Sequence, residues 1–333
     1  MAVERKVRVG VIGAGGISQV AHIPNLLAVP SAELAAVCDT DSNRAALVAD
    51  RFEIPAWFDQ PERMLQVEKL DCVLVATPTI SHLPLCKLAL ESGADVLIEK
   101  PFARNFDEAR QMVETAERTG RLLMIGMNHR FRDDTALLKQ LLESGELGEL
   151  LMVRSGWLKR HGVWGRPYWF TDPKLSGGGV LLDLGIQMLD LVLYLLGFPT
   201  VVEMACGISH KTLELEVEDT AVAFIRFADE VVFSLEVSWA NYDRDDVAYT
   251  LFSGSLGGAS LNPLRFSRRQ RNRVVEVTPP GLGDLMELYR RSFKAEISHF
   301  IECVQRRTEP LSNARQGLQV QEVIEGLYRS SGQ

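Results

Sequence analysis

Short apolar runs alternate with helical patterns through the first third of the chain. Five apolar runs predict strands, at residues 7–12, 34–38, 71–76, 95–98 and 122–126, and residues 57–65 are expected to give a further short strand and a helix. None contains proline, and the run at 71–76 is nearly continuous in apolar residues, which suits a strand buried on both faces of a parallel sheet. Helical patterns lie between the runs, the longest over 107–119 with Gly120 after it. This alternation predicts an α/β fold, a doubly wound parallel sheet of the Rossmann kind.

After about residue 126, apolar and polar residues alternate along longer strands. In the clearest, 231–239, the odd positions are large and apolar, and the even ones after Val232 are Ser, Glu and Ser. Such a strand buries one face and exposes the other, as antiparallel strands do. Further strands are expected at 150–159, 200–210, 220–227, 247–253 and 273–278. The second half should therefore be an α+β domain with a mainly antiparallel open sheet of five or six strands.

The two patterns divide the chain into a Rossmann domain, residues 1–126, and an α+β domain, residues 127–333. A length of 333 residues agrees with two domains, because single cores stop growing near about 250–300 residues. Helices expected at 292–305 and 314–330 should pack at the edge of the second sheet or on the first domain.

A dinucleotide-binding pattern spans the first two predicted strands. A glycine turn at residues 13–18 follows the first strand, and the second strand ends in Asp39. Glycines in such a turn allow the close approach of a pyrophosphate, whose charge lies at the helix N-terminus. The residues expected to bind it are Gly13, Gly15, Gly16, Ile17 and Ser18. Ser18 replaces the third glycine of the pattern but is small enough for the helix and strand to pack closely.

Asp39 indicates which cofactor is bound. It follows Ser18 by 39 − 18 = 21 positions, close to the roughly 20 that separate the glycine pattern from the ribose-binding acid. A carboxylate accepts hydrogen bonds from ribose hydroxyls and repels a 2′-phosphate, so NAD is favoured over NADP, although the nearby Arg44 would weaken that preference. The alternative is a glycine turn in an α/β domain that binds nothing.

Composition excludes several function classes. The net charge of −8 argues against a nucleic-acid or anionic-membrane partner, and the only basic run, 265–273, fits a solvated bend between two strands. Five cysteines without a C-x-x-C pair suggest reduced core residues, and we expect no metal site. The first strand starts too early for a signal peptide, and no uncharged run approaches the roughly 20 residues of a membrane span. We expect a soluble, cytoplasmic protein.

Lys100, in Glu99-Lys100-Pro101, follows a buried strand at the sheet edge where open α/β proteins bind ligands. A partly desolvated ammonium there could stabilise an alkoxide or exchange a proton with a substrate hydroxyl. A solvated loop lysine is the alternative.

A triple glycine at 177–179 precedes an apolar helix whose polar residues are Asp183, Gln187 and Asp190. Their steps of four and three place them on one helical face. Burying an unpaired carboxylate costs several kcal/mol. These three residues are therefore expected either to bind a ligand, or to stabilise the helix dipole and form hydrogen bonds in the core.

These stretches together resemble the glucose-fructose oxidoreductase / inositol dehydrogenase / rhizopine-catabolism (Gfo/Idh/MocA) family of NAD(P)-dependent oxidoreductases, over essentially the full length. The resemblance is carried by residues 11–17, Ala76-Thr77-Pro78 with His82, Glu99-Lys100-Pro101, residues 128–131, and 177–179 with Asp183 and Asp190.

The resemblance implies a set of site residues. Besides the glycine turn and Asp39, it implies cofactor contacts from Thr77, Pro78, His82, Glu99 and Lys100, with Asn128 near the nicotinamide. It further implies a cis Lys100–Pro101 peptide, catalytic roles for Lys100 and Asp183, and a homodimer or homotetramer formed through the open sheet.

One position departs from the family. Four residues after the aspartate, its sugar and cyclitol dehydrogenases carry a His, or in some relatives a Tyr, that transfers a proton; here Gln187 cannot titrate. In one explanation Lys100 transfers the proton itself while Asp183 and Gln187 hold the substrate. Alternatively His161 or Tyr168, in the aromatic loop before the glycines, replaces the missing group, or the hydride chemistry is lost. Because aromatic faces suit a sugar or cyclitol ring, His161 and Tyr168 are also expected to contact the substrate.

The sequence therefore predicts an NAD-dependent oxidoreductase that moves a hydride between nicotinamide and a hydroxyl or carbonyl carbon of a sugar, cyclitol or similar polyol. Lys100, Asp183 and Gln187 are the expected catalytic residues. Two alternatives are a catalytically silent NAD-binding sensor and an NAD-assisted epimerase or eliminase.

Overall fold

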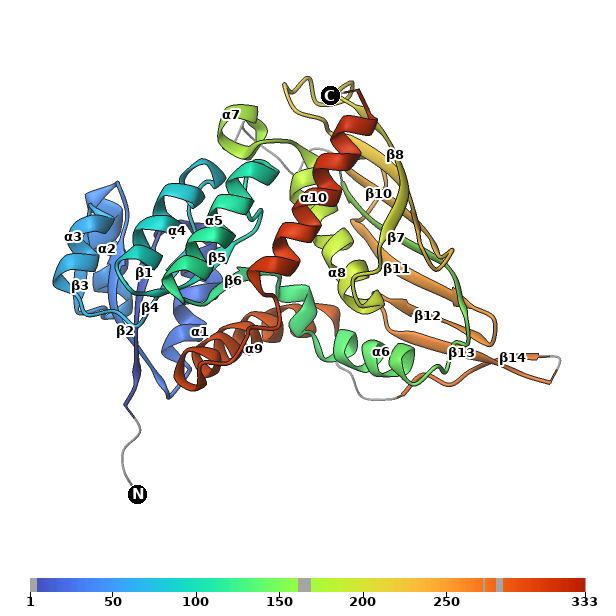
Figure 1. Cartoon of the computed structure of the whole chain (residues 1–333), viewed down its shortest axis with the longest axis horizontal. Coiled ribbons are helices and arrows are strands. Elements are labelled where there is room, and N and C mark those ends of the chain that lie inside the picture. The colour runs from blue at the N-terminus through green and yellow to red at the C-terminus, as the bar shows by residue number, and fades with distance from the viewer. Residues whose placement is uncertain (1–4, 161–168, 272, 280–283, 333) are drawn as a thin grey trace. The chain divides into compact units, whose positions relative to one another are not determined.

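A computed structural model describes residues 5–160, 169–271, 273–279 and 284–332 (Figure 1). The chain forms two compact units. Unit 1 contains Met1–Asn128 and Arg290–Leu318, and unit 2 contains His129–Tyr289 and Gln319–Gln333. Residues 290–318, which the sequence-based division assigned to the second domain, thus belong to the first unit.

Unit 1 is built on a six-stranded sheet in which every pairing is parallel. Its order is β3-β2-β1-β4-β5-β6, so the order reverses between β1 and β4. The strands are β1 (Val7–Ile12), β2 (Ala32–Cys38), β3 (Ala56–Phe58), β4 (Cys72–Val75), β5 (Asp95–Glu99) and β6 (Leu123–Gly126). The predicted doubly wound parallel sheet is confirmed, and its ligand-binding crevice is expected outside the carboxyl ends of the strands at this reversal.

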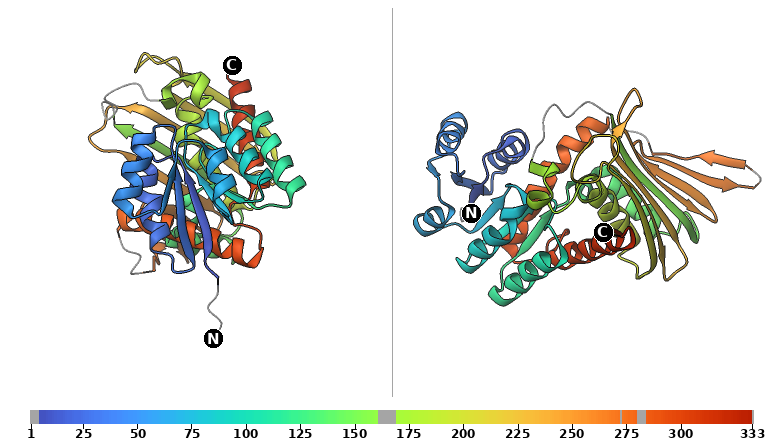
Figure 2. Two further views of the ribbon diagram at one scale, coloured as in Figure 1. Left: turned by 90° about the vertical axis from the view of Figure 1, so that its left-hand side faces the viewer. Right: turned by 90° about the horizontal axis from the view of Figure 1, so that it is seen from above.

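Helices pack on both faces of the parallel sheet (Figure 2). They are η1 (Ser18–His22), a π-helical turn that continues into α1 (Ile23–Leu27), then α2 (Ser42–Phe52), α3 (Pro61–Val67), the 3₁₀ turn η2 (Thr79–Ser81), α4 (His82–Glu91), α5 (Phe106–Thr119) and part of α9 (Leu285–Arg306). Asp41 caps α2 by accepting from the backbone of Arg44. Gly120 ends α5 with φ +64°, a conformation that favours glycine.

Unit 2 contains an eight-stranded sheet of order β14-β13-β12-β11-β7-β10-β9-β8. The strands are β7 (Leu150–Arg160), β8 (Val201–Ser209), β9 (Thr220–Phe227), β10 (Val232–Asn241), β11 (Val247–Gly254), β12 (Gly257–Leu261), β13 (Arg265–Gln270) and β14 (Arg273–Glu276). All neighbours are antiparallel except β7 and β10, which confirms a mainly antiparallel sheet.

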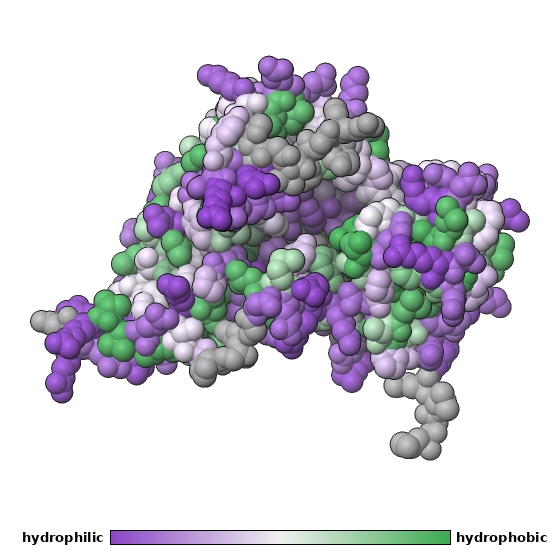
Figure 3. Space-filling model, turned by 180° about the vertical axis from the view of Figure 1, so that it is seen from behind, coloured by the Kyte–Doolittle hydropathy of each residue, from purple (hydrophilic) through white to green (hydrophobic). Residues whose placement is uncertain are grey.

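The expected strand number of five or six was wrong, because β12 and β13 were not predicted. β12 begins with two glycines, which are depleted in strands. β13 occupies residues 265–270 of the basic run 265–273, which was expected to be a bend between two strands. The arginines of β13 and β14 are exposed, and Figure 3 shows the end of this strand pair as mostly hydrophilic.

The other helices of unit 2 include α6 (Asp133–Glu143), α7 (Pro173–Ser176), the π-helical turn η5 (Leu181–Gly185), α8 (Ile186–Leu196) and part of α10 (Ala314–Ser330). The stretch Pro173–Leu196 is long and apolar enough to cross a membrane by length and composition, but 83% of its apolar window is buried within the fold. It is the core helix of this unit. The cysteines are free thiols in the structure, all buried except the half-buried Cys206.

Candidate active site

The glycine turn of unit 1 contains two kinds of glycine. Gly13 has φ +99°, and a Cβ there would lie 2.3 Å from the carbonyl oxygen of Ala76, so the fold itself requires glycine. At Gly15 and Gly16 the φ is not positive, and a Cβ would meet no described heavy atom within 4 Å. The packing of the protein therefore does not explain these two glycines, whereas the close approach of a dinucleotide does.

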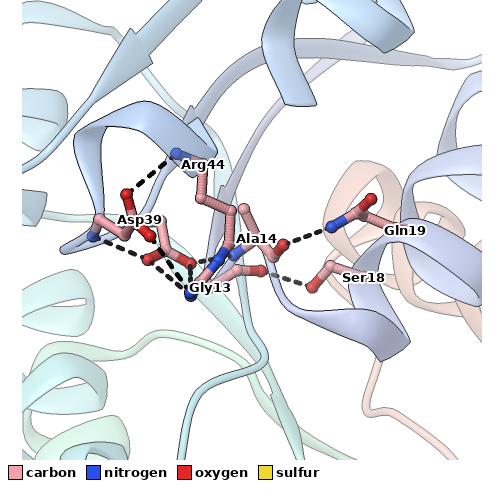
Figure 4. Close-up of polar contacts among 7 residues, drawn as sticks. Gly13, Ala14, Ser18, Gln19, Asp39 and Arg44 are labelled. Carbon is pink, nitrogen blue, oxygen red and sulfur yellow. Dashed lines mark hydrogen bonds and ion pairs between the residues drawn. The ribbon is translucent and has the colours of Figure 1, made fainter. Parts of the chain in front are cut away.

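The helix that follows the turn starts where an anion would bind. Gln19 donates its backbone N–H to the Gly15 oxygen at 3.2 Å, so helical bonding begins at the turn, and N–H groups of a first turn have no partner within their helix. Ser18 is fully buried and donates its hydroxyl to the carbonyl of Gly13 (Figure 4). The serine at the third glycine position is thus accommodated, and its hydroxyl stabilises the turn.

Asp39 lies directly beside the glycine turn (Figure 4). Its Oδ2 accepts from the backbone of Ala14 at 2.9 Å, its Oδ1 accepts from the backbone of Asp41 at 2.9 Å, and the Arg44 guanidinium lies 3.3 Å from Oδ1. These contacts fix a carboxylate at the end of β2, where the ribose hydroxyls of NAD would donate to it. Arg44 occupies the position from which a 2′-phosphate could be bound.

Replacing Asp39 by serine should exchange the cofactor preference. We expect the Kd for NADH to rise about 10- to 100-fold, since hydrogen bonds to a charged group contribute about 1.5–3 kcal/mol. The Kd for NADPH should fall, because the repelling charge is gone and Arg44 is released to pair with the 2′-phosphate. Fluorescence titration with both reduced cofactors measures this. Asp41→Ser, which removes the other acidic partner of Arg44, should keep the preference for NADH.

Glu99 and His22 support the backbone at Lys100. Nε2 of His22 lies 2.7 Å from Oε1 of Glu99, and the Lys100 backbone donates to Oε2 at 3.0 Å. Burial raises the pKa of Glu99, but the hydrogen bond with His22 and the charge of Lys100 outweigh it and lower the pKa below its ordinary value. The Lys100–Pro101 peptide is cis, as the resemblance implied. Glu99 thus holds Lys100 in place, and its predicted cofactor contact stays a prediction.

His82 links two loops at the same sheet edge. It is fully buried, with Nδ1 3.3 Å from the Phe102 carbonyl and Nε2 3.0 Å from the Thr77 carbonyl. Burial lowers the pKa of His82 despite these two contacts. His82 is therefore neutral and connects the two loops internally. Thr77 and Pro78, which follow β4, are accessible. The cofactor contacts predicted for all three stay predictions.

Asn128, at the end of unit 1, is buried and donates from Nδ2 to the hydroxyl of Ser292 at 2.9 Å. Ser292 belongs to α9, so this bond ties the returning helix to the last strand of the sheet. The structure gives Asn128 this internal partner, and its place near the nicotinamide stays a prediction.

In unit 2, Asp183 lies in the π-helical turn η5. Nε1 of Trp239, on β10, donates to Oδ2 of Asp183 at 3.2 Å, and Nε2 of Gln187 donates to the Asp183 backbone oxygen at 2.9 Å. The amide of Gln187 thus binds the helix backbone through its nitrogen, which leaves Oε1 as its acceptor. The turn and these contacts give the carboxylate a fixed orientation.

Asp190 does not join this group. It forms a buried ion pair with Arg130, whose Nε donates to Oδ2 at 2.9 Å, and the guanidinium packs over the rings of Tyr194 and Phe198. The prediction that Asp183, Gln187 and Asp190 form one polar group was therefore wrong for Asp190, whose ion pair with Arg130 is buried in the core. His161 and Tyr168 lie outside the described residues.

Sequence reasoning missed two residues of the site. Trp239 was predicted only as an apolar member of an alternating strand, and no sequence signal distinguished its indole N–H from the rest of the buried face. His22 follows the glycine turn by a few residues, and its partner Glu99 is 77 positions away, so only the fold brings them together.

These contacts define the class of protein. Gly15 and Gly16 leave space that only a ligand requires, and Asp39 faces the same turn, so unit 1 is an NAD-binding domain that places a supported lysine at the carboxyl end of β5. That combination belongs to nicotinamide-dependent oxidoreductases. Residues 7–127 match the family described as "Oxidoreductase family, NAD-binding Rossmann fold", and residues 135–259 match the "GFO/IDH/MocA C-terminal domain". The chain belongs to the Gfo/Idh/MocA oxidoreductase family.

Similar proteins span nearly the whole chain. D-glucoside 3-dehydrogenase of Escherichia coli is 32% identical, with 97% of this chain and 95% of that one covered. Glucose-6-phosphate 3-dehydrogenase of Bacillus subtilis is 31% identical, with coverages of 96% and 95%. Among solved structures, levoglucosan dehydrogenase in complex with NADH superposes with a TM-score of 0.90 at 21% identity, covering 98% of this chain and 97% of that chain.

Proposed function

We propose that this protein is an NAD-dependent dehydrogenase that oxidises a secondary ring hydroxyl of a hexose or hexoside, at carbon 3. The observation that carries the proposal is the 32% identity to D-glucoside 3-dehydrogenase over 97% of the chain. A second relative that covers nearly all of the chain is also a 3-dehydrogenase of a hexose. The glycine turn, with Ser18 accommodated in it, and Asp39 support NAD as the oxidant.

Lys100 is the proton-transferring residue in this proposal. As the alcohol is oxidised, its C–H bond breaks and its hydroxyl proton passes to Nζ of Lys100, which accepts it in its amine form, while the carbon–oxygen double bond forms. Bound NAD supplies the hydride acceptor. In the reverse direction the ammonium returns the proton to the alkoxide oxygen. Glu99 and His22 support this role because they fix the backbone from which the side chain extends.

Asp183 and Gln187 bind the sugar in this proposal. The carboxylate oriented by Trp239 accepts from a ring hydroxyl, and Oε1 of Gln187 accepts from a second. Since Gln187 has no ionisable group, it contributes orientation, and the proton is left to Lys100. A replacement role for His161 or Tyr168 is the competing proposal.

The test is NADH formation across a panel that contains methyl glucosides, glucose, glucose 6-phosphate and a cyclitol, with products identified by NMR. We expect the highest kcat/KM with a glucoside or hexose, and a ketone at carbon 3. Formation of a changed sugar without net NADH would instead identify an epimerase or eliminase. NAD binding without turnover of any sugar would identify a sensor.

We also propose that two or more copies associate through the open sheet of unit 2. Helix α8 packs against one face of this sheet (Figure 2), and no helix in the described ranges covers the other. That face exposes Met152, Val222 and Phe224, whose exposed fractions are 39%, 55% and 37%. Analytical ultracentrifugation should give a dimer or larger assembly, and a monomer at micromolar concentration would contradict this.

A further inference from the structure

The triple glycine before the Asp183 turn differs from the glycine turn of unit 1. A Cβ on Gly178 would lie 2.2 Å from the hydroxyl of Tyr328, and one on Gly179 would lie 2.2 Å from the backbone oxygen of Glu218. These glycines are therefore required by close packing against two residues of unit 2. Tyr328 and Glu218 occupy the space that side chains would need.

Glu218 binds the turn through its side chain and its backbone. Its carboxylate accepts from the backbone N–H of Gly179 at 3.0 Å and of Leu181 at 3.0 Å, and its backbone oxygen accepts from Val180 at 3.0 Å. Only 1% of Glu218 is exposed. The side chain and the backbone oxygen of Glu218 thus together satisfy three successive N–H groups, of residues 179–181, at the start of the helix that carries Asp183. Burial raises the pKa of Glu218, while the hydrogen bonds from Tyr328 and from this backbone lower it.

Tyr328 completes this contact from the C-terminal helix α10. Its hydroxyl donates to Oε1 of Glu218 at 2.7 Å. Burial, together with the neighbouring Glu218, raises the pKa of Tyr328 well above its ordinary value, so the phenol remains a neutral donor.

Asp219, the residue after Glu218, also supports Asp183, through Trp239. The backbone oxygen of Asp219 accepts from the backbone N–H of Trp239 at 2.9 Å, and the indole of the same Trp239 donates to Asp183. The Asp219 side chain is itself held by two backbone N–H groups, from Thr212 and Leu213. Adjacent residues therefore fix both the turn that carries Asp183 and the indole that orients its carboxylate.

We propose that Glu218 and Tyr328 are positioning residues that set the orientation of Asp183 toward the sugar. They do so by holding the backbone of residues 179–181, just before Asp183, and we call these two residues the clamp. This rests on the proposed sugar-binding role of Asp183. Neither residue is adjacent to Asp183 in sequence, and the clamp acts through the backbone of residues 179–181.

The test uses Tyr328→Phe, which removes one hydroxyl, and Glu218→Gln, which replaces the carboxyl acceptor at the turn. We expect kcat/KM for the sugar to fall about tenfold in the first and about 10²-fold in the second, because small displacements of a positioning group cost up to about 10²-fold. The Kd for NAD should be unchanged, since its site lies in unit 1. Thermal unfolding identifies any variant that fails to fold, and the phenylalanine variant is the milder of the two.

Glu143→Gln is the matched control for Glu218→Gln. It removes the exposed carboxylate that pairs with Lys139 on α6 of the same unit, and should retain wild-type kcat/KM.

The decisive comparison repeats Tyr328→Phe in an Asp183→Asn background, at high enzyme concentration. If the clamp acts through Asp183, the loss caused by Tyr328→Phe should disappear there. Equal losses in both backgrounds, or wild-type kcat/KM in both clamp variants, would overturn the clamp alone. Full activity of Asp183→Asn would overturn the proposed role of Asp183, and the clamp with it.

Discussion

Replacing Lys100 by methionine should lower kcat for sugar oxidation about 10²–10⁴-fold, the usual contribution of a positioned acid–base group. Methionine keeps an apolar side chain of similar length but has no atom that can take the hydroxyl proton. The Kd for NAD should change little, because the glycine turn and Asp39 are untouched. Steady-state kinetics with the best sugar of the panel, together with calorimetric titration of NAD, measure the two quantities separately.

Lys69→Met is the control for this variant, since Lys69 is an exposed lysine of the same unit. It should retain wild-type kcat. If Lys100→Met retained more than about a tenth of wild-type kcat, proton transfer by Lys100 would be wrong. His161 or Tyr168 would then be the next candidates for the missing acid–base group.

The second large effect is expected at Gly15. Gly15→Val should raise the Kd for NAD by at least about 10²-fold, roughly 3 kcal/mol, because the added methyl groups would occupy space that the dinucleotide requires. The free energy of unfolding should stay within about 0.5 kcal/mol of wild type, since a Cβ at this position meets no described atom within 4 Å. Calorimetry and urea unfolding give the two values.

Gly13→Ala should show a different behaviour. Its φ of +99° and the carbonyl 2.3 Å from the added Cβ predict a loss of more than about 1 kcal/mol in unfolding free energy. The contrast separates a glycine required by the fold from one required by a ligand. Loss of stability in Gly15→Val, with NAD affinity retained in the folded fraction, would contradict our interpretation of the turn.

The architecture of unit 1 could be predicted from sequence because local signals agree with the fold. Continuous apolar strands and the glycine after α5 gave element boundaries close to those observed. The second sheet was harder. β12 opens with glycines and β13 is rich in arginine, so their strand conformation comes from antiparallel pairing with neighbours rather than from their own residues.

The candidate site shows the same limit. The glycine turn and Asp39 follow from spacing within one βαβ pattern, and Lys100 from its place at the end of a buried strand, whereas the supports of Asp183 come from distant strands and helices. Periodicity assumed a regular helix through Asp183 and Asp190, but the π-helical turn changes the register, and the two carboxylates have different partners. No sequence pattern distinguishes Trp239 or Tyr328 from other buried aromatic residues.

The activity proposed for this chain is transfer of a hydride from a sugar carbon to NAD bound at its glycine turn. Its most direct test is isotope transfer from a methyl glucoside that carries deuterium at carbon 3, with the recovered NADH analysed by mass spectrometry. We predict NADH that carries the deuterium, together with a 3-keto sugar. Unlabelled NADH would contradict oxidation at carbon 3, and the absence of NADH with every sugar of the panel would contradict the dehydrogenase itself.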